Sequence, residues 1–562
     1  NIIEGLKASV FGSVQRNSYT DGAYRALNSE ASLEDQDYPG GGYASKSNLL
    51  NEKYAFEPTL QYNTTVAEKH AITALAGYSY RYEKDEGQSA DNRGFINDNF
   101  HEDNLSEGQA LRDGRANMDS YKNDNTLIAF FGRMTYNYDN RYLLMASIRH
   151  EGSSRFGEDN KWGNFPGISV GWRLNNESFM KDIKWIDTIK LRAGFGITGI
   201  NAGENYQSLS GLTYGDYFLS DGKWIRELVP TRNANSDLKW EKKEELNFGL
   251  DFGFFEDRIS GAIDYYERRT KDALMDYSVP TPPYVYGTIK ANAAEIKNSG
   301  LEILLNVTPI KTSNFSWVAN LTYSTNINKV VSLSNDKFQL TNNFFDTGYT
   351  GEPIQISTHR VQEGQPIGNF FGLKSVDITD DGIWIIETPD GRRIPATQAT
   401  TEDRQVLGNG LPKSYYSINN TLRYKSWDFN VNLRGARDYQ ILNFSRMYYE
   451  NPTIAYNTLD TAYDKVYGKA VLNDVQRYVS YYVEDGDFLK IDNITIGFTL
   501  PNAGFKFIDT LRIYATGNNL ATFTKYKGID PEVNRDGLFP GNDDRDKYPS
   551  TRSFSIGLNI TL

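Results

Sequence analysis

The sequence lacks several features that would point to common protein classes. It contains no cysteine, which excludes a disulfide scaffold and a cysteine-ligated metal site. It has no apolar run approaching the roughly 18 residues of a membrane-spanning helix. Its 60 basic residues are outnumbered by 72 acidic ones, and no basic patch indicates nucleic acid as a partner. The four histidines are scattered, and no motif of a metalloprotease, hydrolase or P-loop enzyme surrounds them.

Aromatic residues are abundant for so polar a chain. They make up 14% of the 562 residues, with 38 Tyr and 30 Phe, although the mean hydropathy is −0.58. A transmembrane β-barrel combines these properties, because alternate residues of each strand face lipid and a wet lumen and aromatic girdles mark both interfaces. A soluble all-β propeller or a series of sandwiches is the alternative that composition leaves open.

Apolar and polar residues alternate strictly in many segments, most clearly at the end of the chain. There Phe554, Ile556, Leu558, Ile560 and Leu562 fall on one face of an extended segment. Residues 246–254 and 427–434 repeat the pattern. Alternation of period two predicts strands with one apolar face, and in a membrane only a closed barrel satisfies the backbone of such strands.

The alternation gives about sixteen strands, joined in turn by short turns and long polar loops. Short turns are predicted near 139–140, 256–257 and 501–509. Long polar loops are predicted near 84–124, 201–238 and 270–296, and the two longest over 328–411 and 441–485. Short turns at one rim and long loops at the other are typical of outer-membrane barrels and argue against a propeller. We therefore predict an all-β, antiparallel, up-and-down transmembrane barrel with long extracellular loops.

Charged residues on the polar faces are predicted to line the lumen, where contact with water keeps the free-energy cost of a charge low. They include Arg192, Asp251, Asp264 and Arg434. Glycines occur at lumen positions, such as Gly249 and Gly497. They indicate either that material filling the barrel approaches the wall closely or that the strands bend at these positions.

Candidate catalytic and metal-binding residues are few. His150, beside Glu151 and Ser153, is the only nucleophile-and-base candidate, and we favour a structural turn there and predict no enzyme.

Calcium is considered at one acidic turn only. Asp377, Asp381 and Glu387 resemble part of a calcium loop, but Thr388 stands where a bidentate Glu is needed. A solvated acidic turn is the favoured interpretation, a structural calcium the alternative, and we expect no other cofactor.

The loop 328–411 carries the candidate substrate-binding residues. Aromatic rings beside carboxylates are how proteins hold sugars, since apolar ring faces stack while hydroxyls find acceptors. The favoured alternative is that these rings fix the loop to a neighbouring segment or to a partner protein. The candidates are Phe344, Phe345, Asp346, Tyr349 and Trp384.

Several short phrases, in order along the chain, resemble one family. They include Phe131-Gly132-Arg133, the loop Glu151, Gly152, Ser153, Ser154, Arg155 and Phe156, then Leu489-Lys490-Ile491-Asp492-Asn493 and Asp530-Pro531-Glu532-Val533. The set resembles the SusC/RagA-like TonB-dependent outer-membrane transporters. The resemblance implies a barrel of about 22 strands that encloses a plug. Residues 1–562 would then be its C-terminal barrel portion, without the plug and the first strands.

The resemblance also implies a function, a location and partners. We expect TonB-dependent import of a bulky nutrient, a glycan fragment or an oligopeptide, across the outer membrane of a Gram-negative bacterium. The expected partners are a SusD-like surface lipoprotein that acts as a lid, membrane lipid, and TonB through an N-terminal portion outside this chain. A dimer of transporter–lipoprotein pairs is expected as well. A passive sixteen-strand porin without a partner is the alternative.

Overall fold

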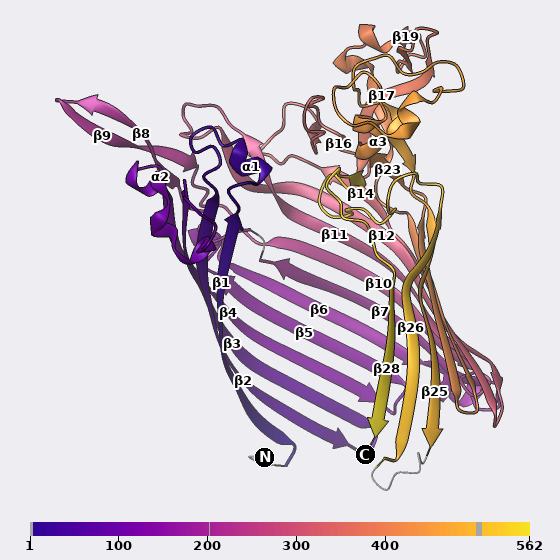
Figure 1. Ribbon diagram of the computed structural model, residues 1–562. Coiled ribbons are helices and arrows are strands. Elements are labelled where there is room, and N and C mark those ends of the chain that lie inside the picture. Colours follow the sequence, from indigo (N-terminus) through magenta and orange to yellow (C-terminus); the bar gives the residue numbers. More distant parts are fainter. Residues whose placement is uncertain (1–3, 202, 502–507, 562) are drawn as a thin grey trace.

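The predicted alternation is realised as one long antiparallel sheet that curves into the wall of a cylinder (Figure 1). The computed structural model describes residues 4–201, 203–501 and 508–561. Each strand position of the wall pairs with the next one along the chain, as the up-and-down topology requires, with β13 and β14 sharing one position. The wall contains β1 (Leu6–Arg25), β2 (Tyr43–Val66), β3 (His70–Arg93), β4 (Asn117–Tyr138), β5 (Tyr142–Ser153), β6 (Trp162–Arg173), β7 (Ile186–Ile200), β10 (Glu241–Phe254), β11 (Ile259–Ser278), β12 (Thr288–Lys311), β13 (Phe315–Thr325), β14 (Ile327–Ser332), β21 (Ser414–Tyr424), β22 (Trp427–Arg437), β25 (Phe488–Pro501), β26 (Thr510–Thr524) and β28 (Ser553–Thr561).

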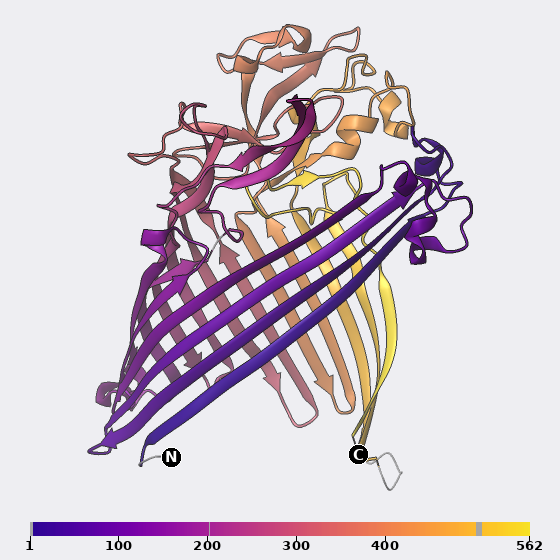
Figure 2. The same cartoon turned by 90° about the vertical axis from the view of Figure 1, so that its left-hand side faces the viewer.

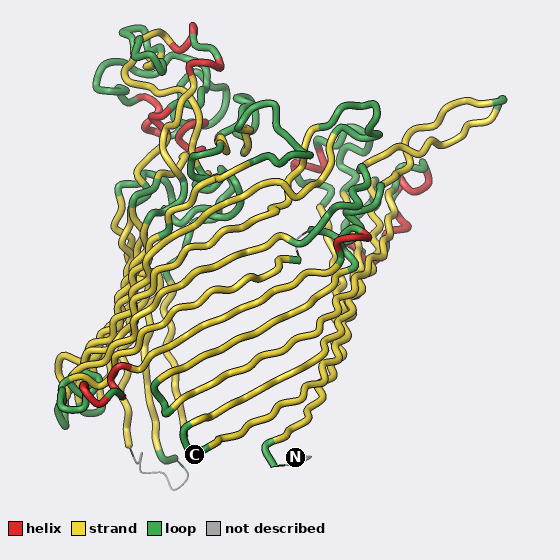
Figure 3. Tube along the Cα trace, turned by 180° about the vertical axis from the view of Figure 1, so that it is seen from behind, coloured by secondary structure: helices red, strands yellow, loops and turns green. Residues whose placement is uncertain are grey.

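The sheet has two edges in the part of the chain that the structure describes. β1 pairs only with β2, and β28 pairs only with β26. β13 and β14 are separated by Asn326 alone and both pair with β12, so they occupy one strand position. The all-β antiparallel fold predicted from the sequence is confirmed. Figure 3 shows both labelled ends of the chain at the rim opposite the long loops.

Several strands extend far beyond the thickness of a membrane. β2, β3 and β12 each have 24 residues. At about 3.3 Å per residue they measure about 80 Å, against a hydrocarbon core of about 30 Å. The predictions of loops over 84–124 and 270–296 were therefore partly wrong, because backbone pairing continues where apolar alternation has stopped.

The apolar face of the wall is exposed. Phe248 is 49% exposed, and Phe554 and Ile556 of β28 are more exposed still, as expected of side chains that contact lipid. Leu562 lies outside the described residues, and so does most of the turn predicted at 501–509.

Charged side chains of the lumen face meet across neighbouring strands. Arg192 on β7 donates to Asp251 on β10 at 2.7 Å and to Asp264 on β11 at 2.9 Å. Its guanidinium lies across Gly249, where a Cβ would stand 2.5 Å from Cζ. Arg512 reaches Asp428 across Gly497 in the same way. These glycines thus make room for arginines that link strands, which the sequence-based alternatives did not include.

The helices are short, and no helix in the described ranges is long and apolar enough to cross a membrane. The α-helices are α1 (Glu30–Leu33), α2 (Gln109–Arg112) and α3 (Phe444–Tyr449).

The two longest predicted loops fold together as a small domain above one rim, shown in orange in Figure 2. Residues 328–411 form a six-stranded sheet, and residues 441–485 pack against it. This unit, which we call the loop domain, replaces the irregular loops that were predicted. Its strands and those beside it are β15 (Phe344–Thr347), β16 (His359–Gln362), β17 (Asn369–Ile378), β18 (Trp384–Glu387), β19 (Arg393–Pro395), β20 (Arg404–Asn409), β23 (Gln440–Asn443), β24 (Val483–Asp485) and β27 (Asn542–Asp543).

A further hairpin lies in the segment 201–238, which had been predicted as a loop. It consists of β8 (Gly211–Ser220) and β9 (Lys223–Arg232). The hairpin projects away from the wall at the upper left of Figure 1. Among the residues that the structure describes, its strands pair only with each other.

Candidate binding site at the mouth of the barrel

Trp384, one of the predicted substrate-binding residues, lies in the core of the loop domain, so this prediction is wrong. Trp384 is fully buried, and its ring packs 5.2 Å from Tyr481 and 5.9 Å from Tyr482. Its cluster joins residues of both long loops, among them Phe370 and Tyr448. A side chain without exposed surface is unavailable to a sugar ring, so Trp384 holds the two loops together instead.

Phe344 and Asp346 form one compact arrangement around an arginine. The guanidinium of Arg360 lies 3.6 Å from the ring centroid of Phe344 and 3.7 Å from that of Phe371. Asp346 accepts two hydrogen bonds from it, at 2.7 and 3.0 Å. Stacking and bidentate pairing together occupy the faces and one edge of the guanidinium. The arrangement fixes β15 to its neighbours, in line with the favoured alternative.

The other two candidates differ in exposure. Phe345 packs against the buried cluster of Val330, Leu333 and Val361, whereas Tyr349 is 58% exposed. Tyr349 lines a cavity of about 590 Å³ together with residues 542–547, from a loop almost 200 positions away in the sequence. Of the five candidates, the structure therefore places Tyr349 at a cavity wall.

A buried ionic network ties the loop 525–552 to the barrel wall. Lys490 on β25, with 2% of its side chain exposed, lies 2.8 Å from Asp530 and 2.6 Å from Glu532. Arg434 on β22 donates to Glu532 at 3.0 Å and to Asp492 at 2.8 Å. Two cations from the wall thus hold two carboxylates of the loop, so the loop is fixed to β22 and β25.

The electrostatics of the loops follow from this network. Burial by itself would raise the pKa of Asp530, but hydrogen bonds from Lys490 and Ser550 outweigh it and keep that pKa below its usual range. Burial acts on Glu532 in the same way, and bonds from Arg434 and Lys490 lower its pKa. The sequence phrases already singled out these residues, but only the fold shows that they meet.

His359 connects the loop domain to the same loop. Burial lowers its pKa to about 4, so the ring is neutral at pH 7. Nε2 lies 2.8 Å from the carbonyl oxygen of Pro540 and donates to it, which leaves Nδ1 to accept from the Thr358 hydroxyl. From sequence this residue was simply one of four scattered histidines.

Two of the three calcium candidates, Asp377 and Glu387, each pair with a different lysine. Asp377 lies 2.5 Å from Lys469, and Glu387 lies 2.5 Å from Lys374. These hydrogen bonds lower the pKa of both carboxyls. Among the described residues, no group of three acidic or histidine side chains has the arrangement to hold a metal ion. The structure does not bring Asp377, Asp381 and Glu387 together.

The family-motif loop forms a structural junction at the rim. Glu151 accepts from Arg149 at 2.6 Å, and Ser154 Oγ accepts from the amide of Thr126 at 2.9 Å. Ser153 donates to Asn201 at 3.0 Å, and Arg155 donates to Asn205 at 2.9 Å. At Gly152 a Cβ would stand 2.7 Å from the Trp162 ring, and Phe156 is buried against Trp240.

The nucleophile-and-base candidate is not assembled at this junction. His150 pairs with Asn164 at 2.8 Å and stacks on Trp162 at 4.6 Å. Glu151 and Ser153 have the other partners just described. Each of the three side chains is thus engaged in a separate contact.

Comparison with known proteins agrees with this architecture. The family model described as "TonB dependent receptor-like, beta-barrel" matches residues 6–520. TonB-dependent receptor P3 of Formosa agariphila is 30% identical over 552 residues, which is 92% of this chain and 52% of the relative. TonB-dependent receptor SusC of Bacteroides thetaiotaomicron is 30% identical over 487 residues, 82% of this chain and 47% of the relative.

A solved structure of the RagAB peptide transporter has a TM-score of 0.85 and 21% identity, and the match covers 100% of this chain and 60% of that chain. At this identity the likeness shows the fold. The chain spans about half the length of the curated relatives it matches. The resemblance to SusC/RagA-like transporters predicted from the short phrases is confirmed. The chain belongs to the TonB-dependent receptor-like β-barrel family.

Proposed function

We propose that this chain forms the wall and mouth of a TonB-dependent importer in the outer membrane of a Gram-negative bacterium. Its cargo is a bulky nutrient, either a glycan fragment or an oligopeptide. The family match over residues 6–520 carries this proposal. Two features of the structure support the proposal: the exposed apolar face of the wall suits contact with lipid, and the folded loop domain suits a barrel whose entrance is controlled.

Import of this kind moves a solute without making bonds. We therefore assign no catalytic residue, and the separate contacts of His150, Glu151 and Ser153 support that assignment. TonB would act on a plug supplied by sequence outside this chain, and transporter–lipoprotein pairs would form a dimer. A folded, well-packed loop domain above the rim supports gated import over a passive porin.

The proposed partner is a SusD-like lipoprotein, and the hairpin β8–β9 is the surface that we propose it covers. Cross-strand partners such as Tyr214 with Leu228 and Leu219 with Trp224 lie on one face of the hairpin. A two-stranded hairpin is marginal in water by itself, and an apolar stripe of this size marks an interface. Its apolar members, all more than half exposed, are Leu212, Tyr214, Tyr217, Leu219, Trp224 and Leu228.

Deletion and complementation of the full-length gene test the function. We expect growth on the cognate glycan or peptide to require the gene and TonB, and to return with the wild-type copy. TonB-independent uptake through a steady open channel would instead support the porin.

Copurification tests the partner. We expect Leu219→Asp with Trp224→Asp to remove the lipoprotein from the purified complex by more than tenfold. Leu111→Asp, at an exposed position in α2 outside the hairpin, serves as the control. Retention of the lipoprotein by the double variant would refute the assignment of the hairpin.

A further inference from the structure

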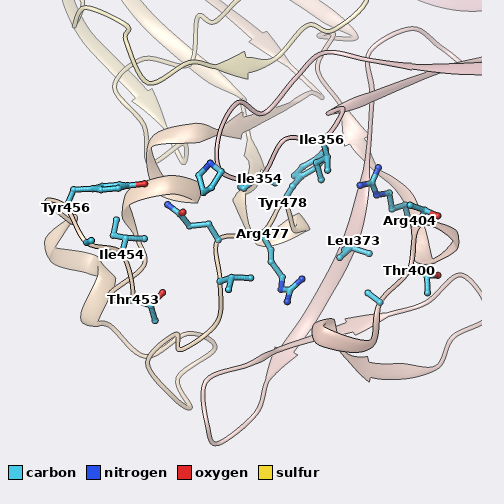
Figure 4. A pocket seen from close by; sticks show the side chains of 16 residues that line it. Ile354, Ile356, Leu373, Thr400, Arg404, Thr453, Ile454, Tyr456, Arg477 and Tyr478 are labelled. Carbon is cyan, nitrogen blue, oxygen red and sulfur yellow. The ribbon is translucent and has the colours of Figure 1, made fainter. Parts of the chain in front are cut away.

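A second cavity lies within the loop domain, between the segments 353–404 and 453–478 (Figure 4). Its volume is about 770 Å³. Ile354, Ile356 and Leu373 line it with apolar surface, and all three pack against the buried core of the domain. Because that core contains Trp384 and Tyr478, one wall of the cavity belongs to the most rigidly packed part of the loops. The walls of the cavity are therefore part of the folded loop domain, and the cavity is not a gap between unpacked loops.

Two arginines stand at the walls of this cavity, Arg404 and Arg477. None of its lining residues is acidic. The chain as a whole carries a net charge of −12, so a cavity with two cations and no lining carboxylate departs from the rest of the molecule. Because Asp474 pairs with Arg477, the unbalanced positive charge at this cavity is that of Arg404, and it attracts anions and disfavours metal ions and ammonium groups.

The nearest carboxylate in sequence to Arg404 is engaged elsewhere. Asp403 accepts from the amide and the hydroxyl of Thr400 at 2.8 and 3.0 Å, in a capping box at the start of a short 3₁₀ turn. In the part of the chain that the structure describes, the Arg404 guanidinium forms no ion pair. A half-buried guanidinium without a carboxylate has five donors to offer a ligand.

Arg477 is held in place and keeps part of its donor capacity. Its Nε donates at 3.0 Å to Asp474, whose side chain is 3% exposed. This bond anchors the guanidinium by one nitrogen and leaves its terminal nitrogens for another acceptor. Across the cavity, the exposed ring of Tyr456 adds an apolar face.

We infer that this cavity binds a carboxylate carried on an apolar or ring-faced body, as a cargo subsite of the importer. The inference rests on the proposed function. A planar carboxylate matches the fork of a guanidinium in two parallel hydrogen bonds, and the isoleucine and leucine wall takes the body of the ligand. Two kinds of cargo present this chemistry, namely a peptide with a free C-terminus and a glycan that contains a uronic acid.

Calorimetry on the full-length protein in detergent tests the inference, with matched probes that differ only in the carboxylate. The peptide probes are Ala-Ile-Leu with a free C-terminus and the same peptide amidated. The glycan probes are tri-galacturonate and its methyl ester. We expect one acid to bind about ten- to a hundredfold more tightly than its neutral form, because a charge-assisted hydrogen bond is lost in the neutral form. The acid that binds shows whether the cargo is a peptide with a free C-terminus or a glycan that contains a uronic acid.

Variants then assign the binding to the cavity. We expect Arg404→Gln to reduce the affinity for the acid to that of its neutral form and Arg404→Lys to restore part of it. Arg393→Gln, at an exposed position outside the cavity, should change nothing. Retention of the heat-modifiable band on a gel checks that each variant is folded. The comparison of probes on the wild-type protein stands even if a variant fails.

Two results would overturn the inference: neither acid binds more tightly than its neutral form, or Arg404→Gln leaves the preference unchanged. Binding in detergent requires neither TonB nor the lipoprotein, so this failure is separate from a failure of the proposed function, which the deletion strain reports.

Discussion

The replacement Lys490→Met would release the loop 525–552 from the barrel wall. The variant keeps the length of the side chain but removes the ammonium group that lies within 2.8 Å of Asp530 and 2.6 Å of Glu532. Asp530 then keeps its bond from Ser550, and Glu532 keeps Arg434. The loop would therefore open more often without leaving its place altogether.

The magnitude follows from the burial of the three groups. Lys490 and Asp530 have 2% and 6% of their side chains exposed, so the removal of one partner leaves a desolvated charge. Such removals cost about 3–5 kcal/mol, and because Glu532 is 28% exposed and keeps Arg434 we take the lower end. About 3 kcal/mol corresponds to a roughly hundredfold higher population of the open loop.

Hydrogen exchange measured by mass spectrometry on peptides from 525–552 reports this opening. We expect about a hundredfold faster exchange at pH 7.5, and no change in the exposed control Lys525→Met. The pH dependence should also change sign. In the wild type the ionised form of Asp530 stabilises the closed loop, so closure weakens only as the pH falls through its lowered pKa. In the variant burial dominates and raises that pKa, so closure strengthens as the pH falls towards 5.

Equal exchange rates in Lys490→Met and the wild type, to within twofold, would refute the reasoning. That result would mean that the ion pairs at Asp530 and Glu532 do not hold the loop.

Three further predictions follow from single sites. Phe156→Ala should destabilise the rim junction by about 3–5 kcal/mol, because the ring is fully buried against Trp240, and faster exchange in 233–240 would show it, with the exposed Phe100→Ala as control. His359 has a pKa of about 4 in the folded protein, so its contribution to loop-domain stability, about 3 kcal/mol, is complete above pH 6.5 and declines as the pH falls towards 4. The protection factors of residues 340–375, which correct for the intrinsic pH dependence of exchange, should fall between pH 7 and 5 more in the wild type than in His359→Gln, and an equal fall would contradict this. Gly249→Ala places a Cβ 2.5 Å from Arg192 and should destabilise the protein by about 1–3 kcal/mol, which would lower the temperature at which the heat-modifiable band disappears. Gly12→Ala, whose Cβ would stand 4.0 Å from the nearest atom, should not lower it.

The wall of the barrel could be predicted from the sequence because one physical cause acts at every second residue. Lipid on one side and water on the other impose the alternation that 246–254 and 427–434 display. Where strands rise above the membrane this cause disappears. The segments 84–93 and 270–278 accordingly looked like loops although they are paired strands.

The mouth was harder to predict, because its contacts join residues that are remote in the sequence. Trp384 looked like a sugar platform since aromatic composition does not reveal burial. Lys490 and Asp530 belong to two separate sequence motifs, and nothing in the sequence indicated that they pair. The hydrogen bond between His359 and Pro540 joins residues that are 181 positions apart. Nothing in the sequence pointed to Arg404. Among the described residues its guanidinium has no ion pair because the neighbouring Asp403 caps a short helix instead, and this can be seen only in the fold.

The orientation of side chains on one wall strand tests the central claim most directly. These 562 residues contain no cysteine, so no native thiol in them competes for the label. Single cysteines at positions 429 to 433 of β22, in the full-length protein in membranes, would carry spin labels. The account predicts that labels at Phe429, Val431 and Leu433 are relaxed more by oxygen dissolved in lipid. Labels at Asn430 and Asn432 should respond more to a water-soluble nickel complex. A response that does not alternate along this strand would contradict a wall with lipid outside and water within.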